Sequence, residues 1–257
     1  MFEYTIIIVS LNTKKQFLKT INSVKKQKYK NYEVIIVDGL SKDGTIEEIK
    51  KIKKKNVKFI IEKDKGIYDA MNKGIRLSKG KWLIFMNSGD NFANVNVLKK
   101  LSKNNFYNQN IIFGDTIINH NFIKVHKEGR YFNNFTVTMP FCHQSTLVRT
   151  KLLKKNFFNL KYKLSSDFNF FLDAFNNNNF FLKYDGIISE VTAYGKSDLE
   201  RQKVYGENIQ IFLKKKFYFK ILFLICLKFT EFIKTLIKLL LPSKLVKYIL
   251  KLKYQKI

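Results

Sequence analysis

The amino-acid sequence predicts an α/β protein with a Rossmann-like, mostly parallel sheet that is flanked by helices. Two nearly continuous β-branched runs, Tyr4–Ser10 and Glu33–Gly39, are typical of strands covered on both faces. Between them, Lys14–Lys26 places apolar residues at helical spacing. A strand, a helix and a strand in this order form a β-α-β unit, so we expect the two strands to be parallel.

The alternation of strand and helix continues to residue 86. A polar turn after the second strand leads into a helix that begins at Thr45. The next segments are a strand, a helix that ends before Gly80 and a fourth strand, predicted at Val57–Ile61, Ile67–Ser78 and Lys81–Met86. The first half of the chain therefore has the pattern of a parallel sheet with its crossover helices.

Beyond Asp90 the elements become mixed. They are a helix, a strand, alternating antiparallel strand material, a helix and a closing strand, predicted at Asn94–Leu101, Ile111–Gly114, Thr116–Arg130, Ser165–Phe175 and Phe180–Tyr184. This order indicates an α/β sandwich with a modified second half. We expect residues 1–206 to form this domain and residues 207–257 to form a basic amphipathic helical tail.

The composition is that of a folded chain with a large positive charge. Hydrophobic residues make up 46% of the chain, and the net charge is +28. Such a charge favours nucleic acid, an anionic membrane or an anionic substrate, but Lys is spread over the whole chain, so a compositional bias of the source genome explains part of it. Cys142 and Cys226 follow no metal spacing, and the first residues have no signal-peptide pattern; both favour a reducing cytosol.

Several classes of enzyme are excluded by missing motifs. The sequence has no Cys/His metal set, no Gly-x-Ser-x-Gly elbow and no Gly-x-x-x-x-Gly-Lys phosphate loop. We therefore exclude zinc enzymes, serine hydrolases and P-loop NTPases.

The tail from residue 201 onward holds 14 Lys or Arg against two acids. Its segment 217–241 is interrupted by charges, so it lacks the ~18–20 uncharged residues that cross a bilayer. On a helical projection the charges fall on an arc of roughly 160°, opposite the apolar residues Ile225, Phe229, Phe232, Leu236 and Leu240. Pro242 ends this helix and a second basic segment, Lys244–Tyr254, follows. We expect 217–254 to bind an anionic membrane surface; packing on the domain or self-association is the alternative.

Carboxylates follow the predicted strand ends. Asp38 ends the second strand and Asp43 lies just before a helix start, where a carboxylate can accept a hydrogen bond from a nucleobase or a ribose hydroxyl. The alternative is that Asp38 is a turn acid and Asp43 caps the helix.

The segment from Asp64 to Asp90 has the layout of a metal-diphosphate site. It begins with a polar helix start and a helix that includes Asn72, and ends in a buried strand with the acidic turn Asn87–Asp90. Asp90 can share Mg²⁺ or Mn²⁺ with two phosphates, because an open α/β sheet places ligands outside its strand ends. The alternative is an ordinary Gly-Asp turn.

Two further positions suggest an acceptor side. Asp167 is predicted in the first turn of a helix, where a carboxylate can act as general base on an acceptor hydroxyl. Its alternative role is that of a helix N-terminal acid favoured by the dipole. His143 and Gln144 are acceptor-side candidates, and for His143 a satisfied structural histidine is the alternative.

These motifs together resemble the family-two glycosyltransferases of the GT-A fold, in particular the small bacterial members that build surface polysaccharides. The likeness covers about residues 4–200 and is dense over the first 90. The residues that carry it are Thr5–Ser10 with Asn12, Val37–Gly39 with Ser41–Thr45, Asp64–Gly74 and Met86–Asp90, and then Phe141–Ser145, Ser165–Asp167 and Gly195–Ser197.

The resemblance implies roles for individual residues. Asp90 would be the metal-binding acid of a DxD-type motif, and Asp167 the acid that deprotonates the acceptor. Asp38 would contact the base of the nucleotide, and the donor site would also include Ser10, Asn12, Asp43, Asp64, Asn72 and Asn87. Family members invert the anomeric centre by direct displacement.

One departure from the family pattern concerns the metal turn. Many relatives carry two or three acids there, whereas this chain has Asn87 and Gly89 and keeps only Asp90. Related members show this Asn-x-Gly-Asp form, so we do not interpret it as inactivation.

The sequence therefore predicts an inverting glycosyltransferase of cell-surface polysaccharide biosynthesis. It would move a sugar from a nucleotide diphosphate sugar to a hydroxyl of a glycan or lipid-linked glycan, with Mn²⁺ or Mg²⁺ as cofactor. The favoured donor is a UDP-sugar. We expect it in the cytoplasm, on the inner face of the cytoplasmic membrane, with no nucleic-acid partner. The alternative is a non-catalytic basic protein that binds membrane or nucleic acid on a degenerate version of the fold.

Overall fold

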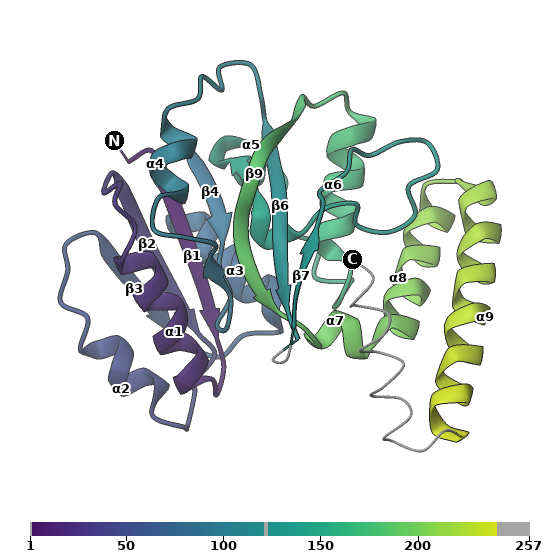
Figure 1. Cartoon of the computed structure of the whole chain (residues 1–257), viewed down its shortest axis with the longest axis horizontal. Coiled ribbons are helices and arrows are strands. Elements are labelled where there is room, and N and C mark those ends of the chain that lie inside the picture. The colour runs from purple at the N-terminus through teal and green to yellow at the C-terminus, as the bar shows by residue number, and fades with distance from the viewer. Residues whose placement is uncertain (1, 121–122, 241–257) are drawn as a thin grey trace.

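The structure, a computed structural model, describes residues 2–120 and 123–240. Within them a nine-stranded sheet carries helices on both faces (Figure 1). The strands are β1 (Tyr4–Ser10), β2 (Tyr32–Asp38), β3 (Val57–Ile61), β4 (Trp82–Phe85), β5 (Asn91–Phe92), β6 (Ile111–Asn119), β7 (Lys124–Lys127), β8 (Thr146–Arg149) and β9 (Phe181–Thr192). The helices are α1 (Lys14–Lys25), α2 (Thr45–Lys50), α3 (Ile67–Leu77), α4 (Val97–Ser102), α5 (Thr150–Lys155), α6 (Ser166–Asn176), α7 (Lys196–Leu199), α8 (Arg201–Lys214) and α9 (Tyr218–Leu240), with a 3₁₀ turn η1 (His143–Ser145).

The first half of the chain forms the parallel part of the sheet, as predicted. The strands lie in the order β3-β2-β1-β4, and each neighbouring pair is parallel. Every residue of β1 and of β2 is buried, because helices cover both faces of these strands. The predicted elements of this half are confirmed to within about one residue at each end.

The second half makes the whole sheet mixed rather than mostly parallel. β8 lies antiparallel between β4 and β6, and β7 and β5 add further antiparallel pairs, whereas β6 and β9 are parallel. The predicted closing strand runs on to Thr192 instead of ending at Tyr184. β5, β8, α5 and α7 were not predicted, and α8 was expected only from residue 207 onward, as part of the helical tail. The two strands have only two and four residues, too few to show a periodicity.

The sheet separates two hydrophobic cores. Alternate residues of β1 and β2 point to opposite faces, so Ile6 and Ile36 pack with α1, α2 and α4, while Ile7 and Ile35 pack with α3, α5, α6 and α8. Gly74 lets α3 approach β1 closely, because a Cβ there would lie 2.8 Å from the Ile7 side chain.

Helix α8 joins the second core and crosses the predicted domain boundary. Tyr205, Ile211 and Phe212 are buried in this core, so residue 206 lies inside a helix that the domain needs. The division at residue 206 stays a prediction, and a truncation that separates α9 from the domain is better placed after Lys216.

Helix α9 packs beside α8 at the edge of the molecule (Figure 1). Leu224 is fully buried in the second core, and Ile221 and Leu227 are partly buried against it. No helix of the described residues is both long enough and apolar enough to span a bilayer. The second predicted tail segment, Lys244–Tyr254, lies outside the described residues.

Candidate active site

The residues predicted for the nucleotide gather at one edge of the sheet. Ser10 and Asp38 are the last residues of β1 and β2 and are paired in register. Asn87 and Asp90 follow β4, which is parallel to β1. Because parallel strands end at the same edge, the fold brings these four residues to one side of the domain.

Asp38 is the centre of a buried hydrogen-bond network. Its Oδ2 accepts from the hydroxyls of Ser10 at 2.6 Å and Ser41 at 2.7 Å, and its Oδ1 accepts from the Ser41 N–H at 2.7 Å. The residue is 0% exposed. Asp38 therefore fixes the loop after β2, and the base contact expected of it stays a prediction.

A second network ties the start of α1 to the same loop. The Asn12 N–H donates to Ser41 Oγ at 2.7 Å, and the Asn12 side-chain oxygen accepts a main-chain N–H of the loop. Asp43 accepts from the N–H groups of Lys14 and Thr45, which begin α1 and α2, and from the Thr45 hydroxyl. The Thr45 hydroxyl and then the Lys14 N–H lower the pKa of Asp43. These contacts are those of the capping alternative, and a donor role for Asp43 stays a prediction.

Asp64 and Asn72 occupy different surroundings. Asp64 accepts from the Gly66 N–H at 2.9 Å, and its other oxygen lies so close to Gly39 that a Cβ there would be 2.4 Å away. It therefore lies beside the loop after β2. Asn72 is buried, and its amide donates to and accepts from the main chain of Phe158 at 2.9 and 3.0 Å. That amide clamps α3 to a distant loop, and the donor contact expected of Asn72 stays a prediction.

The acidic turn after β4 is shaped from α1. The hydroxyl of Thr20 donates to the Asp90 carbonyl at 2.7 Å and accepts from the Gly89 N–H at 2.9 Å. Gly89 has φ +106°, a conformation that favours glycine. Within the described residues, Asn87 Oδ1 and Ser88 Oγ are buried without a hydrogen-bond partner. The turn thus offers unpaired oxygen atoms two and three positions before Asp90.

The carboxylate of Asp90 is itself buried. Its residue is 7% exposed, and Oδ2 accepts from Gln144 Nε2 at 3.0 Å. Burial raises the pKa of Asp90 to about 7, although the Gln144 hydrogen bond opposes this shift. Gln144 was predicted on the acceptor side, whereas its side chain contacts the proposed metal acid.

Asp167 lies in the first turn of α6, as predicted, with three groups around it. The Tyr68 hydroxyl donates to Asp167 Oδ1 at 2.7 Å, and the Phe168 N–H donates to the same oxygen at 2.8 Å. His143 Nδ1 lies 3.6 Å from the other oxygen, Oδ2. Burial lowers the pKa of His143 despite the neighbouring charge of Asp167, so the ring is neutral at pH 7.

The 3₁₀ turn η1 joins the two carboxylates. Its consecutive residues His143 and Gln144 contact Asp167 and Asp90 respectively. Ser145 anchors the turn to β6 and β9 through hydrogen bonds to the Asp115 carbonyl and the Ser189 hydroxyl. Asp90 and Asp167, which are 77 positions apart in the sequence, therefore lie on one side of the molecule and flank one short turn.

Two residues of this site were missed by the sequence analysis. Tyr68 lies inside the Asp64–Gly74 motif but was not singled out. Glu207, on α8, accepts the N–H groups of Lys163, Leu164 and Ser165 at 2.8 to 2.9 Å and so holds the segment before Asp167. No local pattern indicates the Glu207 contact, because its partners are more than 40 positions away.

The residues of the acidic turn fit a hard divalent cation. Mg²⁺ and Mn²⁺ prefer oxygen ligands and bind through one or two carboxylates together with phosphate oxygens and water. Asp90 supplies a carboxylate, and Asn87 Oδ1 is a buried oxygen without a partner among the described residues. Those residues contain no cluster of three His, Cys, Asp or Glu, so the turn fits a site that a donor's phosphates complete.

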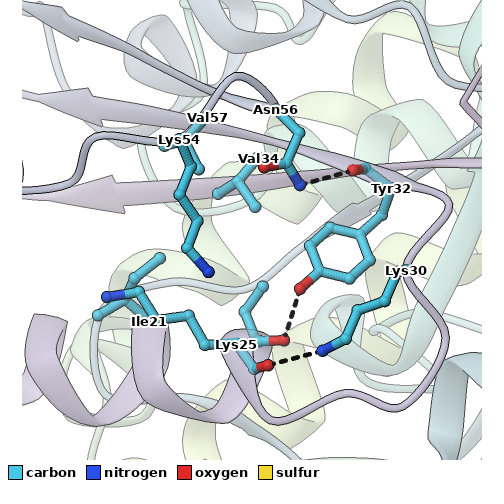
Figure 2. Close-up of a pocket in the computed structure, with 9 residues that line it drawn as sticks. Ile21, Lys25, Lys30, Tyr32, Val34, Lys54, Asn56 and Val57 are labelled. Atoms are coloured by element: carbon cyan, nitrogen blue, oxygen red, sulfur yellow. Dashed lines mark hydrogen bonds between the residues drawn. The ribbon is translucent and has the colours of Figure 1, made fainter.

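A lysine-lined pocket lies at the opposite end of the sheet. The cavity has a volume of about 200 Å³ and lies at the amino end of β2. Figure 2 shows Lys25, Lys30 and Lys54 around it. Tyr32, the first residue of β2, donates its hydroxyl to the Val24 carbonyl at 3.0 Å. Because Tyr32 and Asp38 mark the two ends of β2, this pocket is separate from the two carboxylates.

Solved structures share the fold. Staphylococcus aureus TarS 1-349 in complex with UDP-GlcNAc matches with a TM-score of 0.64 at 20% identity, over 82% of this chain and 65% of that one. The mannosyltransferase PcManGT from Pyrobaculum calidifontis in complex with GDP-Man and Mn²⁺ matches with a TM-score of 0.63 at 14% identity, over 83% and 64%. The match thus spans less than two thirds of either structure, and it confirms the GT-A class of α/β fold.

Sequence comparisons identify the family. The PGL/p-HBAD biosynthesis glycosyltransferase of Mycobacterium bovis (strain BCG / Pasteur 1173P2) is 29% identical over 184 residues, which are 68% of this chain and 70% of the relative. An uncharacterized glycosyltransferase of Rickettsia bellii (strain RML369-C) is 31% identical over 134 residues, 51% of this chain and 18% of the relative. The family model Glycosyl transferase family 2 matches residues 5–159, more than half of the sequence. With the GT-A fold and two carboxylates gathered at one turn, the chain belongs to glycosyl transferase family 2.

Proposed function

We propose that this glycosyltransferase moves a sugar from a nucleotide diphosphate sugar to a hydroxyl of a glycan or lipid-linked glycan, and inverts the anomeric centre as it does so. The favoured donor is a UDP-sugar. The observation that carries the proposal is the placement of Asp90 and Asp167 against consecutive residues of η1. One carboxylate suits the diphosphate of a donor, and the other suits the hydroxyl of an acceptor. Their approach to one turn lets both act on one sugar.

Asp167 performs the proton transfer in this proposal. Its Oδ1 is occupied by the Tyr68 hydroxyl and the Phe168 N–H, which leaves Oδ2 to accept the proton of the acceptor hydroxyl. As that proton leaves, the acceptor oxygen bonds to the anomeric carbon and the bond from this carbon to the diphosphate oxygen breaks. General-base catalysis of this kind accelerates a reaction by about 10²–10⁴-fold.

Asp90 and the rest of the acidic turn bind the donor side. Asp90, together with the unpaired Asn87 Oδ1 of the same turn, would hold Mn²⁺ or Mg²⁺. When bound, the cation offsets the negative charge of the departing diphosphate. Asp38 contributes by fixing the loop after β2 through Ser10 and Ser41, since its own carboxylate is buried.

Cell-surface polysaccharide biosynthesis is the proposed context. Two similar proteins, a PGL/p-HBAD biosynthesis glycosyltransferase and TarS in complex with UDP-GlcNAc, support a UDP-sugar as the first donor to test. GDP-Man and Mn²⁺ in the mannosyltransferase structure make GDP-mannose the second.

A panel of nucleotide sugars tests the donor and the cation together. Thermal unfolding of the full chain is measured with UDP-GlcNAc, UDP-glucose and GDP-mannose, each with and without Mn²⁺, and then release of the nucleotide diphosphate is assayed. A ligand at 100 times its Kd stabilises the folded state by about 2.7 kcal/mol, so we expect one donor to raise the Tm, and to do so more with Mn²⁺. A chain that no nucleotide sugar stabilises, and that releases no nucleotide diphosphate, would contradict the proposed function.

The exposed face of α9 is the proposed membrane contact. Whereas Leu224 packs inward, the residues on the other side of the helix are apolar and exposed: Tyr218, Phe219, Leu222, Phe223, Ile225, Phe229, Phe232 and Ile233. Lys214, Lys216 and Lys228 are exposed close to them in the chain. An apolar face with neighbouring lysines suits an anionic bilayer, into which it buries only partly. We propose that the enzyme works there, on the inner face of the cytoplasmic membrane.

Two phenylalanines of this face provide the test. Burying a Phe side chain is worth about 1.5–3 kcal/mol, so Phe229→Ser with Phe232→Ser should lower binding to phosphatidylglycerol vesicles by about 100-fold or more. Both side chains are more than half exposed, so the variant is expected to fold. The measurement is vesicle cosedimentation, with neutral phosphatidylcholine vesicles for comparison.

The matched control is Phe59→Ser. Phe59 is 44% exposed on β3, at the far side of the molecule from α9 (Figure 1). The Phe59→Ser variant should bind vesicles as the unaltered chain does. Unchanged vesicle binding by the double variant, or a wild-type chain that forms dimers and ignores vesicles, would contradict the membrane role.

A further inference from the structure

We propose that Tyr68 is a positioning residue for Asp167, and that Glu207 holds the same loop from its other side. This inference rests on the proposed function, because it gives both residues a part in orienting the proposed base.

The hydroxyl of Tyr68 connects the loop before α6 to the carboxylate. It lies 2.7 Å from Asp167 Oδ1 and 3.1 Å from the carbonyl oxygen of Leu164. Burial and the charge of Asp167 raise the pKa of Tyr68, so the hydroxyl keeps its proton and can donate it in a hydrogen bond. The ring is 7% exposed and packs against Phe158, so its position is fixed by α3 and by the core.

Glu207 fixes the opposite side of the same peptide units. Its Oε2 accepts the N–H groups of Leu164 and Ser165 at 2.9 Å, and Oε1 accepts that of Lys163 at 2.8 Å. The Leu164 residue is thus held by its N–H from α8 and by its carbonyl from α3. Two helices that are far apart in the sequence set the start of α6, where Asp167 lies.

This clamp has a consequence for the reactive oxygen. The Tyr68 hydroxyl and the Phe168 N–H both bind Oδ1, so the plane of the Asp167 carboxylate is fixed and Oδ2 points away from them. His143, neutral and 8% exposed, lies 3.6 Å from Oδ2 without a hydrogen bond and leaves that oxygen able to accept a proton. Loss of the Tyr68 hydroxyl should therefore reduce the fraction of molecules with a correctly oriented base.

Tyr68→Phe removes the hydroxyl and keeps the ring. A hydrogen bond to a charged group is worth about 1.5–3 kcal/mol, so we expect kcat to fall about 10- to 100-fold, while KM for the donor and the Tm gain with UDP stay as in the unaltered chain. The matched control is Tyr32→Phe, because Tyr32 is equally buried and donates to a main-chain carbonyl, but at the other end of the sheet (Figure 2). It should lower Tm to a similar extent and leave kcat within twofold.

A double variant separates positioning from a general loss of stability. In the Asp167→Asn background, adding Tyr68→Phe should lower the residual rate no further, because Tyr68 acts through the Asp167 carboxylate. The same fold loss in both backgrounds, a wild-type kcat for Tyr68→Phe, or an equal loss for Tyr32→Phe would each overturn the inference.

Hydrogen exchange gives a readout that does not depend on turnover. The amides of residues 163–165 should exchange faster in Tyr68→Phe and in Glu207→Ala than in the unaltered chain, with no such change in Tyr32→Phe. Unchanged exchange at these amides in both variants would overturn the clamp. A wild-type chain that transfers no sugar would instead count against the proposed function, so the two failures are distinguishable.

Discussion

Replacing Asp167 with asparagine is expected to lower kcat by about 10²–10⁴-fold and to leave nucleotide binding unchanged. Asparagine keeps an oxygen that can accept from the Tyr68 hydroxyl and the Phe168 N–H, so the local structure should persist. What it loses is the basicity that takes the acceptor proton. The measurement is the rate of nucleotide diphosphate release with the donor that the panel identifies, together with the Tm gain on UDP binding.

The matched control lies on the same helix. Asp173→Asn also removes a carboxylate from α6, but Asp173 is a surface residue paired with Lys215 and bonded to Asn169. The Asp173→Asn variant should keep the rate within about twofold. Its stability should also change little, since exposed ion pairs contribute about 0–1 kcal/mol. Full activity of Asp167→Asn, or loss of its UDP binding, would show that Asp167 is not the base.

Asp90→Asn is expected to abolish the stabilisation of the chain by a donor with Mn²⁺ and to make the cation-free protein more stable at pH 8. Burial of the Asp90 carboxylate carries a cost on the order of a few kcal/mol, because a shift of one pKa unit corresponds to about 1.4 kcal/mol. Asparagine avoids this cost and still accepts from Gln144. The Asp90 carboxylate thus lowers the stability of the cation-free protein, whereas binding of the cation and the donor raises it. Such a loss of stability in favour of activity is common at functional sites.

The pH dependence has a definite sign. The folded-state pKa of Asp90 is raised from 3.8 to about 7. Between these values the folded state binds more protons than the unfolded state, so this group lowers the stability of the cation-free protein as pH rises, and its full cost is present above about pH 7. Mn²⁺ needs the deprotonated carboxylate, so the gain in Tm with donor and Mn²⁺ should grow with pH up to about 7 and then level off.

Urea unfolding at pH 5 and pH 8, each with and without Mn²⁺ and donor, measures both effects. Asp115→Asn is the control, since Asp115 is also largely buried but pairs with His126 away from the acidic turn. That variant should keep the response to Mn²⁺. An Asp90→Asn chain that is still stabilised by Mn²⁺ with donor would contradict the metal assignment.

Local patterns were sufficient for the parallel half of the fold. The buried runs of β1 and β2 and the helical spacing of α1 depend on neighbours within a few residues, so they are legible without a structure. The acidic turn after β4 is legible for the same reason. By contrast, β8 has four residues and owes its place to β4 and β6, its partners on either side.

The individual contacts of the site could not be predicted in this way. Asn72 was assigned to the donor, but its amide binds Phe158, 86 positions away. Gln144 was assigned to the acceptor side, but it donates to Asp90, 54 positions away. A residue type and a motif limit what a side chain can do, whereas its partner depends on how distant segments pack.

By itself, the sequence determined the α/β class, the succession of strands and helices along the parallel half, the candidate acids and the family, because periodicity and short motifs record local preferences. Only the tertiary structure decided that η1 joins Asp90 to Asp167, that Tyr68 and Glu207 hold the loop before Asp167, and which face of α9 is left exposed. The contacts of η1 and of the loop before Asp167 join residues 24 to 99 positions apart, and they are set when the sheet and its two cores assemble.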